Sequence, residues 1–312
     1  MSEDRFWRVK FAWLRYAVGW VGYATMRTVI LLPFAWQLKL GKALGRAARL
    51  VAPARRRVAE RNVAVCFPAL SAAQRSSLVR DHFAALGASF MEMSMGWFGP
   101  EHAVRSRVQI EGEQHLVAAL AKGNGVILYS AHFTTFEFFW PALAPLCPRL
   151  CAMYKWQRNP VMNKMMNEGR GRNFDRLFPK DNVREMLKNL AENAVVWYAS
   201  DQSYIGKGSA LIPFFNEPAM TNTAISRIAN ASGAVVLPYF CRRLPDDSYV
   251  ASIGAPLEGL PSDDEQHDTR RLTSLLEDYI RLCPEQYLWV HQRFKGRPAP
   301  LPDIYTSVRQ TA

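Results

Sequence analysis

Short segments with strand character alternate with helical segments over most of the chain beyond residue 105. The predicted strands are 108–111, 125–130, 149–153, 195–200, 234–240 and 249–253. The predicted helices are 135–143, 160–168, 183–193, 221–231 and 269–282. Because parallel neighbours need a crossover connection, usually a helix, this alternation favours one α/β domain with a largely parallel or mixed central sheet flanked by helices. Apolar residues make up 49% of the 312, enough to fill the core of such a domain.

The segment from Tyr16 to Trp36, YAVGWVGYATMRTVILLPFAW, is the most distinctive in composition and carries one charge, Arg27. Its length fits the roughly 20 mostly apolar residues of a bilayer-spanning helix. We therefore predict a membrane-anchor helix within residues 1–45 and a catalytic domain over residues 46–312. An arginine near the middle of a span costs about 2.5–3.5 kcal/mol, so a helix lying in the membrane interface and a soluble core helix remain alternatives.

The net charge of +12 indicates an anionic partner, which can be nucleic acid, an anionic membrane surface, or an acidic protein or substrate. Basic residues follow the apolar segment closely: Lys39, Lys42, Arg46, Arg49, Arg55, Arg56, Arg57 and Arg61. Under the positive-inside tendency this side of the anchor, and the catalytic domain with it, is cytoplasmic. The same residues can hold anionic lipid headgroups. Because the sequence has no recognisable nucleic-acid-binding module, we expect no nucleic acid partner.

A helical pattern runs from about Ser71 to Phe98, with one apolar face. Its members recur at three- and four-residue steps: Phe83, Leu86, Phe90, Met93 and Trp97. Such a stripe predicts core packing, and the lining of a site for a flexible acyl chain is the alternative.

The stretch GVILYSAHFTTFEFF, residues 125–139, places a histidine directly after an apolar strand. In α/β sheets, ligands bind where strands hand over to helices. His132 and Glu137 are five residues apart, which within one helix separates them by about 140°. If His132 lies in the turn ahead of a helix that begins near Thr134, its ring can meet Glu137. That carboxylate would fix the tautomer and leave the other ring nitrogen to accept a hydroxyl proton.

Two other interpretations of this stretch remain open on these residues alone. Thr134-Thr135-Phe136-Glu137 matches the S/T-x-x-E capping box, in which Glu137 would only cap the helix. His132 would then be a buried histidine with satisfied nitrogens. His291, in YLWVHQRFK, is a competing base, but it has no carboxylate nearby in sequence, and we expect it to be structural.

The chain as a whole resembles the late (secondary) acyltransferases of lipid A biosynthesis. The H-x-x-x-x-E pattern is similar to the H-x-x-x-x-D/E motif of glycerolipid and lipid A acyltransferases. Further matching strings are RNVAVCFPAL (61–70), MEMSMGWF (91–98), MYKWQRNPVMN (153–163), RGR (170–172), DQSYIGKG (201–208), PFF (213–215) and PEQYLWVHQRFKGRP (284–298). Several of these strings are uncommon and occur in the family's order. The resemblance implies that His132 is a general base and that Glu137 orients it.

The resemblance also implies the reaction. A fatty acyl group passes from acyl carrier protein to the hydroxyl of a 3-hydroxyacyl chain on a Kdo-bearing lipid A precursor. Family members work at the cytoplasmic side of the bacterial inner membrane, so anionic inner-membrane lipids are expected partners. No cofactor and no metal are expected. An acyl-CoA donor is the alternative, although the charge of +12 suits the acidic carrier protein.

Attack on a thioester builds negative charge on the carbonyl oxygen, and a preorganised donor there lowers the barrier by a few kcal/mol. Arg170 is the first candidate for this donor and Arg172 the second. Either can instead hold a substrate phosphate, and a surface arginine pair is the plain alternative.

Four more residues are candidates because they follow predicted strands. Asp201 and Gln202 come after the strand 195–200, so we expect them at the ligand edge of the sheet. Asp201 is expected to hold Arg170 or to position the acceptor sugar, with helix capping as the alternative. Lys155 and Arg158, on the loop after the strand 149–153, suit an anionic headgroup.

Two rival functions remain. One is an acyltransferase for another lipid acceptor, a phospholipid or glycolipid. The other is a metal-dependent hydrolase, because His and Glu are also metal ligands, although the sequence has no H-E-x-x-H pattern and no second ligand pair at an informative spacing.

Overall fold

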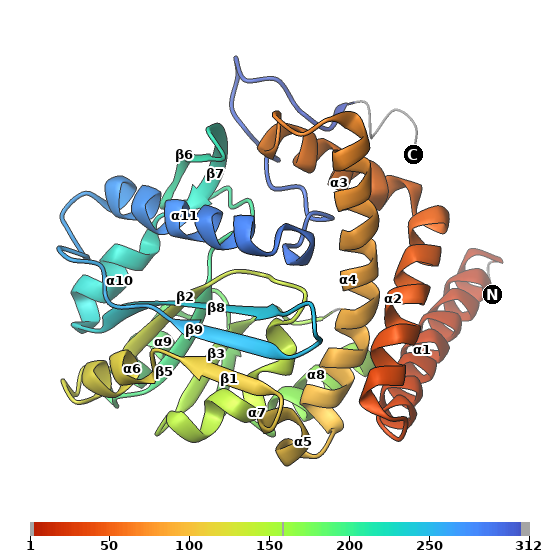
Figure 1. The fold of residues 1–312 in the computed structure, drawn as a ribbon, viewed down its shortest axis with the longest axis horizontal. Coiled ribbons are helices and arrows are strands. Elements are labelled where there is room, and N and C mark those ends of the chain that lie inside the picture. Colours follow the sequence, from red (N-terminus) through yellow and green to blue (C-terminus); the bar gives the residue numbers. More distant parts are fainter. Residues whose placement is uncertain (1–2, 158, 307–312) are drawn as a thin grey trace.

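The computed structural model describes residues 3–157 and 159–306, with side chains from residue 16 onward. Seven strands form the main sheet (Figure 1). Their order is β1 (Val108–Glu111), β9 (Tyr249–Ile253), β8 (Val235–Arg243), β2 (Val126–Ser130), β5 (Val195–Ala199), β3 (Leu150–Tyr154) and β4 (Arg176–Pro179). All neighbouring pairs are parallel except β8 with β9. The predicted fold class, a largely parallel or mixed α/β sheet flanked by helices, is confirmed.

The six predicted strands all form, and three further strands were not predicted. One is β4 at the sheet edge, and the others are β6 (Ser209–Phe214) and β7 (Glu217–Asn222), which pair as a separate antiparallel hairpin. The hairpin turn at Phe215 and Asn216 has positive φ at both residues, which suits the twist of a two-residue hairpin loop but lacks the usual Asn-Gly signal.

Helices cover both faces of the sheet, so the central strands are apolar on both sides. Along β2, Ile127 and Tyr129 enter one core, with α9 (Val183–Ala191), α10 (Ala224–Ser232) and α11 (Glu265–Leu282). Val126 and Leu128 enter the other, with α6 (Glu113–Leu120) and α7 (Trp140–Leu143). The chain continues from β2 to α7 on one face and from β5 to α10 on the other. The carboxyl ends of these two neighbouring strands therefore form a topological switch point, where open α/β sheets bind ligands.

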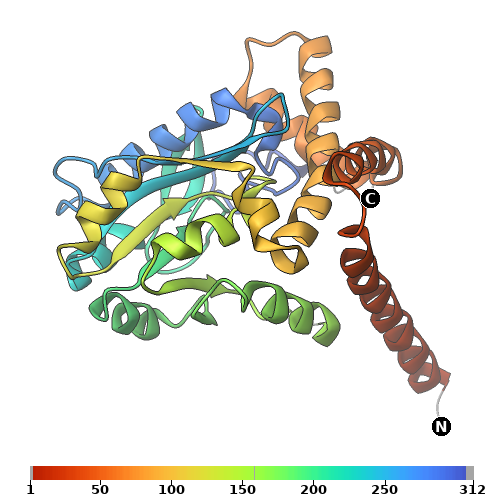
Figure 2. The ribbon, with the colours of Figure 1, turned by 60° about the horizontal axis from the view of Figure 1, so that its bottom comes forward.

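The first four helices of the described chain all precede the sheet: α1 (Glu3–Val29), α2 (Phe34–Val51), α3 (Pro53–Cys66) and α4 (Ala72–Phe98). The helix predicted from Ser71 is confirmed as α4, which begins with a capping box between Ser71 and Gln74. α2 lies along α4, and α1 extends away from the body of the molecule (Figure 2).

The prediction of one continuous anchor helix over residues 16–36 is wrong. α1 ends at Val29, and α2 begins after Pro33, which has no amide proton and disfavours helical backbone at Leu32. No helix in residues 3–157 and 159–306 is both long and apolar enough to cross a membrane. The predicted domain boundary between residues 45 and 46 falls inside α2.

Glycines bring α2 and α4 into close contact. A Cβ atom on Gly45 would lie 2.0 Å from the carbonyl oxygen of Phe83, and one on Gly87 would lie 2.0 Å from that of Gly41. The helix backbones therefore touch directly, and this contact fixes which side of α2 faces outward.

One helix and two 3-10 turns complete the frame of the site. α8 (Pro160–Arg170) follows β3 and is capped by the Asn159 side chain, and the 3-10 turns η1 (Phe136–Phe138) and η3 (Pro284–Gln286) lie next to the switch point. The remaining helical elements are α5 (Glu101–Arg105) and the 3-10 turn η2 (Ala144–Leu146).

Candidate active site

The register of two neighbouring parallel strands brings His132 and Asp201 together. Ser130, the last residue of β2, pairs with Ala199, the last residue of β5. His132 and Asp201 each come two residues later, so both extend from the carboxyl edge of the sheet at the same level. The switch point of the fold therefore carries a histidine and a carboxylate side by side.

Both oxygens of the Asp201 carboxylate accept hydrogen bonds from His132. Oδ1 lies 2.6 Å from the ring nitrogen Nδ1, and Oδ2 accepts a hydrogen bond from the backbone N–H of His132 at 3.1 Å. Asp201 is buried, whereas about a quarter of the His132 side chain (25%) is exposed. Burial by itself raises the pKa of Asp201, but the charge and hydrogen bonds of His132 outweigh it and hold that pKa below its usual value.

This contact determines which nitrogen of His132 is available. An ionised carboxylate only accepts, so Nδ1 carries the proton and Nε2 presents a lone pair. In the described part of the chain no side chain bonds Nε2. The rings of Phe136 and Trp197 stand edge-on to the imidazole at 5.8 and 5.9 Å, which gives this base an apolar surrounding.

Glu137 does not contact the ring, so the predicted His132–Glu137 hydrogen bond is wrong. Its carboxylate is buried, and it accepts hydrogen bonds from the indoles of Trp97 (2.8 Å) and Trp140 (2.7 Å). It also forms an ion pair with Arg170. The backbone turns through η1 instead of starting a regular helix at Thr134, and this turn directs Glu137 away from His132. The capping-box alternative fails as well, because both Glu137 oxygens bond these side chains.

Glu137 holds Arg170, whereas we had expected Asp201 to hold it. Its Nε lies 3.0 Å from Oε1 of Glu137, and its Nη2 bonds the same oxygen. Nη1 bonds none of the described residues, and the side chain keeps a small exposed fraction (11%). Removing one partner of such a buried pair typically costs 3–5 kcal/mol, so each fixes the other firmly.

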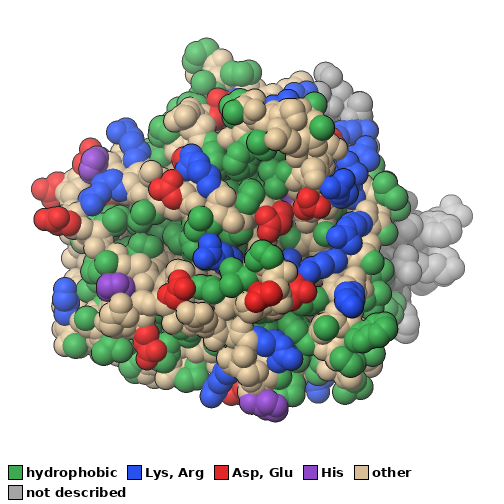
Figure 3. All heavy atoms as spheres, in the orientation of Figure 1, with side chains coloured by type: hydrophobic (Ala, Val, Ile, Leu, Met, Phe, Trp, Pro, Cys, Tyr) green, Lys and Arg blue, Asp and Glu red, His purple; other side chains and the backbone are tan. Residues whose placement is uncertain are grey.

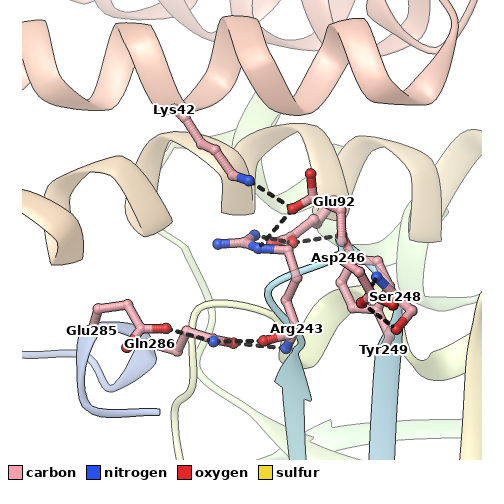
Figure 4. A network of polar contacts seen from close by, with 9 residues as sticks. Lys42, Glu92, Arg243, Asp246, Ser248, Tyr249, Glu285 and Gln286 are labelled. Carbon is pink, nitrogen blue, oxygen red and sulfur yellow. Dashed lines mark hydrogen bonds and ion pairs between the residues drawn. The ribbon is translucent and has the colours of Figure 1, made fainter.

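Residues 286 and 287, in the C-terminal segment, hold the turn that carries His132. Phe133 forms an isolated bridge with Tyr287, and the N–H of Thr134 bonds the carbonyl oxygen of Gln286 at 2.7 Å. The Gln286 side chain in turn bonds both backbone groups of Arg243, at 2.8 and 2.9 Å (Figure 4). The turn is thus fixed to the end of β8.

Arg243 extends this support to the helices. Its guanidinium forms a buried ion pair with Glu92 of α4, which also accepts a hydrogen bond from Tyr249 at 2.8 Å (Figure 4). Asp247, in the turn between β8 and β9, pairs with Lys42 of α2 at 2.6 Å. Glu92, Arg243 and Asp247 were not singled out from the sequence, because a buried pair between segments 151 residues apart leaves no local pattern.

The other predicted binding residues lie at different places. Arg172 bonds the carbonyl oxygens of Trp97 (2.8 Å) and Gly99 (3.3 Å), where a positive charge suits the carboxyl end of α4. Gln202 is half-buried beside Asp201, and Lys155 is exposed on the loop after β3. Arg158 lies outside the described residues.

His291 lies close enough to interact electrostatically with the pair, but it differs from His132 in its surroundings. Burial lowers its pKa to about 4, and its Nε2 is buried without a hydrogen-bond partner. Within the described residues, no three His, Cys, Asp or Glu side chains converge as a metal site would need.

The helical stripe of α4 is mainly core. Phe83 lies in the core under α10 and α11, and Trp97 packs with Phe98 and Met165 while donating to Glu137. Leu86, Phe90 and Met93 are partly buried against these clusters. The predicted core packing is confirmed.

The Asp201–His132 pair at the switch point of this α/β sheet, with the outer ring nitrogen open, has the geometry of a candidate general base and its orienting carboxylate. The chain belongs to the bacterial lipid A biosynthesis acyltransferase family, whose profile matches residues 7–296. It is therefore an acyltransferase.

Individual relatives cover nearly the whole chain. The lipid A biosynthesis lauroyltransferase of Escherichia coli K12 is 31% identical over 93% of this chain and 95% of its own length. The lipid A biosynthesis palmitoleoyltransferase of the same organism is 32% identical with the same coverage. The myristoyltransferase is 27% identical over 91% of this chain and 88% of its own. These relatives carry different acyl names at similar identity, so the family match does not choose a chain length.

Proposed function

We propose that this enzyme transfers a fatty acyl group from acyl carrier protein to the hydroxyl of a 3-hydroxyacyl chain on a Kdo-bearing lipid A precursor. The observation that carries the proposal is the open Nε2 of His132, with Nδ1 held by Asp201 at 2.6 Å, in a member of this acyltransferase family. The relatives named for lauroyl, palmitoleoyl and myristoyl transfer support a long acyl chain as the transferred group.

In the proposed reaction, Nε2 of His132 removes the proton of the acceptor hydroxyl as its oxygen attacks the thioester carbonyl. Asp201 accepts the Nδ1–H bond and stabilises the imidazolium that forms. The tetrahedral intermediate then collapses, the carbon–sulfur bond breaks, and the carrier thiolate receives the proton from Nε2. The products are the acyloxyacyl ester and the free carrier thiol. The histidine and the carboxylate return to their starting states.

We assign Arg170 to stabilising the charge that develops on the thioester, and Glu137 to positioning Arg170. Negative charge develops on the thioester oxygen, and a fixed donor there contributes a few kcal/mol of stabilisation. Arg170 suits this task because Glu137 holds its Nε and Nη2, and its Nη1 can then donate a hydrogen bond to a substrate oxygen. Glu137 is then a positioning residue for Arg170, and Asp201 takes the place we had predicted for Glu137 beside His132. A substrate phosphate is the other anion that Arg170 suits.

The proposed setting is the cytoplasmic side of the bacterial inner membrane. The charge of +12 favours both an acidic carrier protein and an anionic lipid surface, and it raises the rate of encounter with either. Lys155, exposed on the loop after β3, is a further candidate contact for a phosphate of the acceptor.

The test is mass spectrometry of the lipid products that the purified protein makes from a set of acyl carrier donors and a Kdo-lipid A precursor. We expect a product heavier by one acyl group with the wild-type protein. With His132→Ala we expect a rate lower by about 10³-fold or more, with unchanged folding. Transfer to a phospholipid but not to the precursor would assign another acceptor. Near wild-type turnover by His132→Ala would overturn the mechanism.

A further inference from the structure

The outward side of α2 carries two parallel stripes of opposite character. Five apolar side chains on one stripe and four basic side chains on the other each recur at three- and four-residue steps. The apolar stripe consists of Trp36, Leu40, Leu44 and Val51, with Ala47 between the last two. The basic stripe consists of Lys39, Lys42, Arg46 and Arg49. At 3.6 residues per turn, each stripe occupies an arc of about 80°.

The apolar stripe is exposed although it is strongly hydrophobic. Trp36 is 68% exposed, Leu40 43%, Leu44 53% and Val51 82%. Leu31 and Leu32, in the turn before α2, are exposed as well. A contiguous apolar strip of this length on a helix face normally marks a surface that another molecule or a membrane covers.

The side of α2 that packs against the rest of the protein fixes the orientation of these two stripes. Gly41 and Gly45 pack directly against the backbone of α4, and Lys42 is tied to Asp247 of the β8–β9 turn. The helix is therefore mounted on the body of the protein with its apolar stripe facing away. Figure 3 shows Lys and Arg side chains gathered along the edge of the molecule over α2 and α4, beside hydrophobic ones.

We infer that α2 is an in-plane membrane helix that docks the enzyme on an anionic lipid bilayer. Trp36, Leu40 and Leu44 enter the boundary between headgroups and acyl chains, and Lys39 and Arg46 reach the lipid phosphates. A helix with an apolar face beside a basic face binds such a surface by combined burial and charge. Lys39 stands over the Trp36 ring at 6.0 Å, at the border of the two stripes, as a residue at the water–lipid boundary does.

The charge pattern favours a bilayer over a protein as the occupant. An acidic protein would use both stripes only if it carried an apolar groove beside its acidic residues, whereas an anionic bilayer offers charge and apolar depth along the whole helix. This inference deepens the proposed function, because it names the surface through which the enzyme meets its lipid acceptor. It does not depend on the acceptor's identity.

The test is flotation of the full chain with vesicles of phosphatidylcholine alone and of phosphatidylcholine mixed with phosphatidylglycerol. We expect binding to the mixed vesicles that weakens at high ionic strength. Leu40→Glu with Leu44→Glu should lower binding by about tenfold or more, because two charges then face the acyl region. Lys39→Gln with Arg46→Gln should remove the preference for anionic vesicles, at about fivefold per charge. Val117→Glu, on an exposed apolar residue of α6, is the matched control and should bind like the wild type.

Both leucines are exposed, so circular dichroism and the thermal midpoint of the double variant should match those of the wild type. Unchanged vesicle binding by the folded double variant would overturn the inference. A dimer in solution that this variant dissociates would instead assign the face to a second copy, and lost affinity for the carrier protein alone would assign it to that partner. Transfer is assayed separately with detergent-dispersed acceptor. If the wild-type chain binds the vesicles but transfers no acyl group, the proposed function is wrong and the docking surface is still supported.

Discussion

The pair that we assign to proton transfer is made by residues 69 positions apart in the chain. Asp201 holds both the ring and the backbone N–H of His132, so the imidazole has little freedom to rotate. Glu137, five positions from His132, is instead committed to Trp97, Trp140 and Arg170. Two carboxylates close to one edge of the sheet thus hold two different side chains, a histidine exposed enough to meet a hydroxyl and an arginine suited to an anion.

A buried histidine outside this pair predicts how stability depends on pH. Burial lowers the pKa of His82 from 6.5 to about 4, against the opposing effect of its hydrogen bond to the Glu285 carbonyl oxygen. Below 6.5 the unfolded chain binds a proton that the folded protein rejects. Stability from this group is therefore complete above pH 6.5 and falls as the pH drops toward 4, by an amount on the order of 3 kcal/mol. Urea unfolding of the wild type and of His82→Gln across this range measures it. An equal slope in both proteins would contradict the assignment to His82.

The sequence predicted the residues of the site better than their partners. His132, Asp201, Glu137 and Arg170 were each singled out, because each stands at the end of a strand or in a matching motif. The pairing was wrong because it was judged by distance along the chain. The signal that would have corrected it is strand adjacency: if 126–130 and 195–199 are neighbours in register, residues 132 and 201 lie opposite each other.

At the scale of helices and strands, local chemistry explains most of what was predicted. The alternation of strands and helices predicted the sheet. The capping box between Ser71 and Gln74 explains why α4 begins where it does. The anchor prediction failed at Pro33, a break visible in the sequence but outweighed by the apolar composition around it. The hairpin β6–β7 and the edge strand β4 were missed because they are half-exposed, with no clean alternation of apolar residues.

The contact between α2 and α4 predicts a glycine requirement. In Gly87→Ala the new methyl group would lie 2.0 Å from the carbonyl oxygen of Gly41, so the helices must separate. We expect a loss of about 2–3 kcal/mol in the free energy of unfolding, as for other overpacked sites. Gly22→Ala, on α1 with no atom within 4 Å of its Cβ position, is the control and should be neutral or slightly stabilising by helix propensity. Both are read from urea unfolding curves, and equal stability of the two variants would refute the close contact.

At the scale of the whole molecule, the fold keeps the candidate site apart from an exposed surface of mixed character. The α/β body holds His132 and Asp201 at its switch point, and the N-terminal helices carry exposed apolar and basic side chains. The chain of contacts from Lys42 through Asp247, Arg243 and Gln286 connects α2 with the turn of His132 (Figure 4). No sequence pattern reports this chain, because it joins four separate segments.

The overall charge predicts a salt dependence that differs between donors. Attraction of an acidic carrier protein to a molecule of charge +12 is screened by salt. We expect kcat/KM with the acyl carrier donor to fall severalfold between about 0.05 and 0.5 M salt, with little change in kcat. An uncharged acyl thioester of N-acetylcysteamine serves as the control donor and should show no such decrease. Equal salt effects on both donors would argue against electrostatic recognition of the carrier.

The most direct test of the central claim, that Asp201 orients His132 for proton removal, is the pH dependence of the transfer rate in two variants. Asp201→Asn removes the charge that favours a proton on the imidazole, while Glu137→Gln removes the partner of Arg170. Asp201→Asn should lower the rate by about 10³-fold or more and move the acid limb of the profile to lower pH. Glu137→Gln should lower the rate without moving that limb. A limb that moves in Glu137→Gln and stays in place in Asp201→Asn would contradict the account.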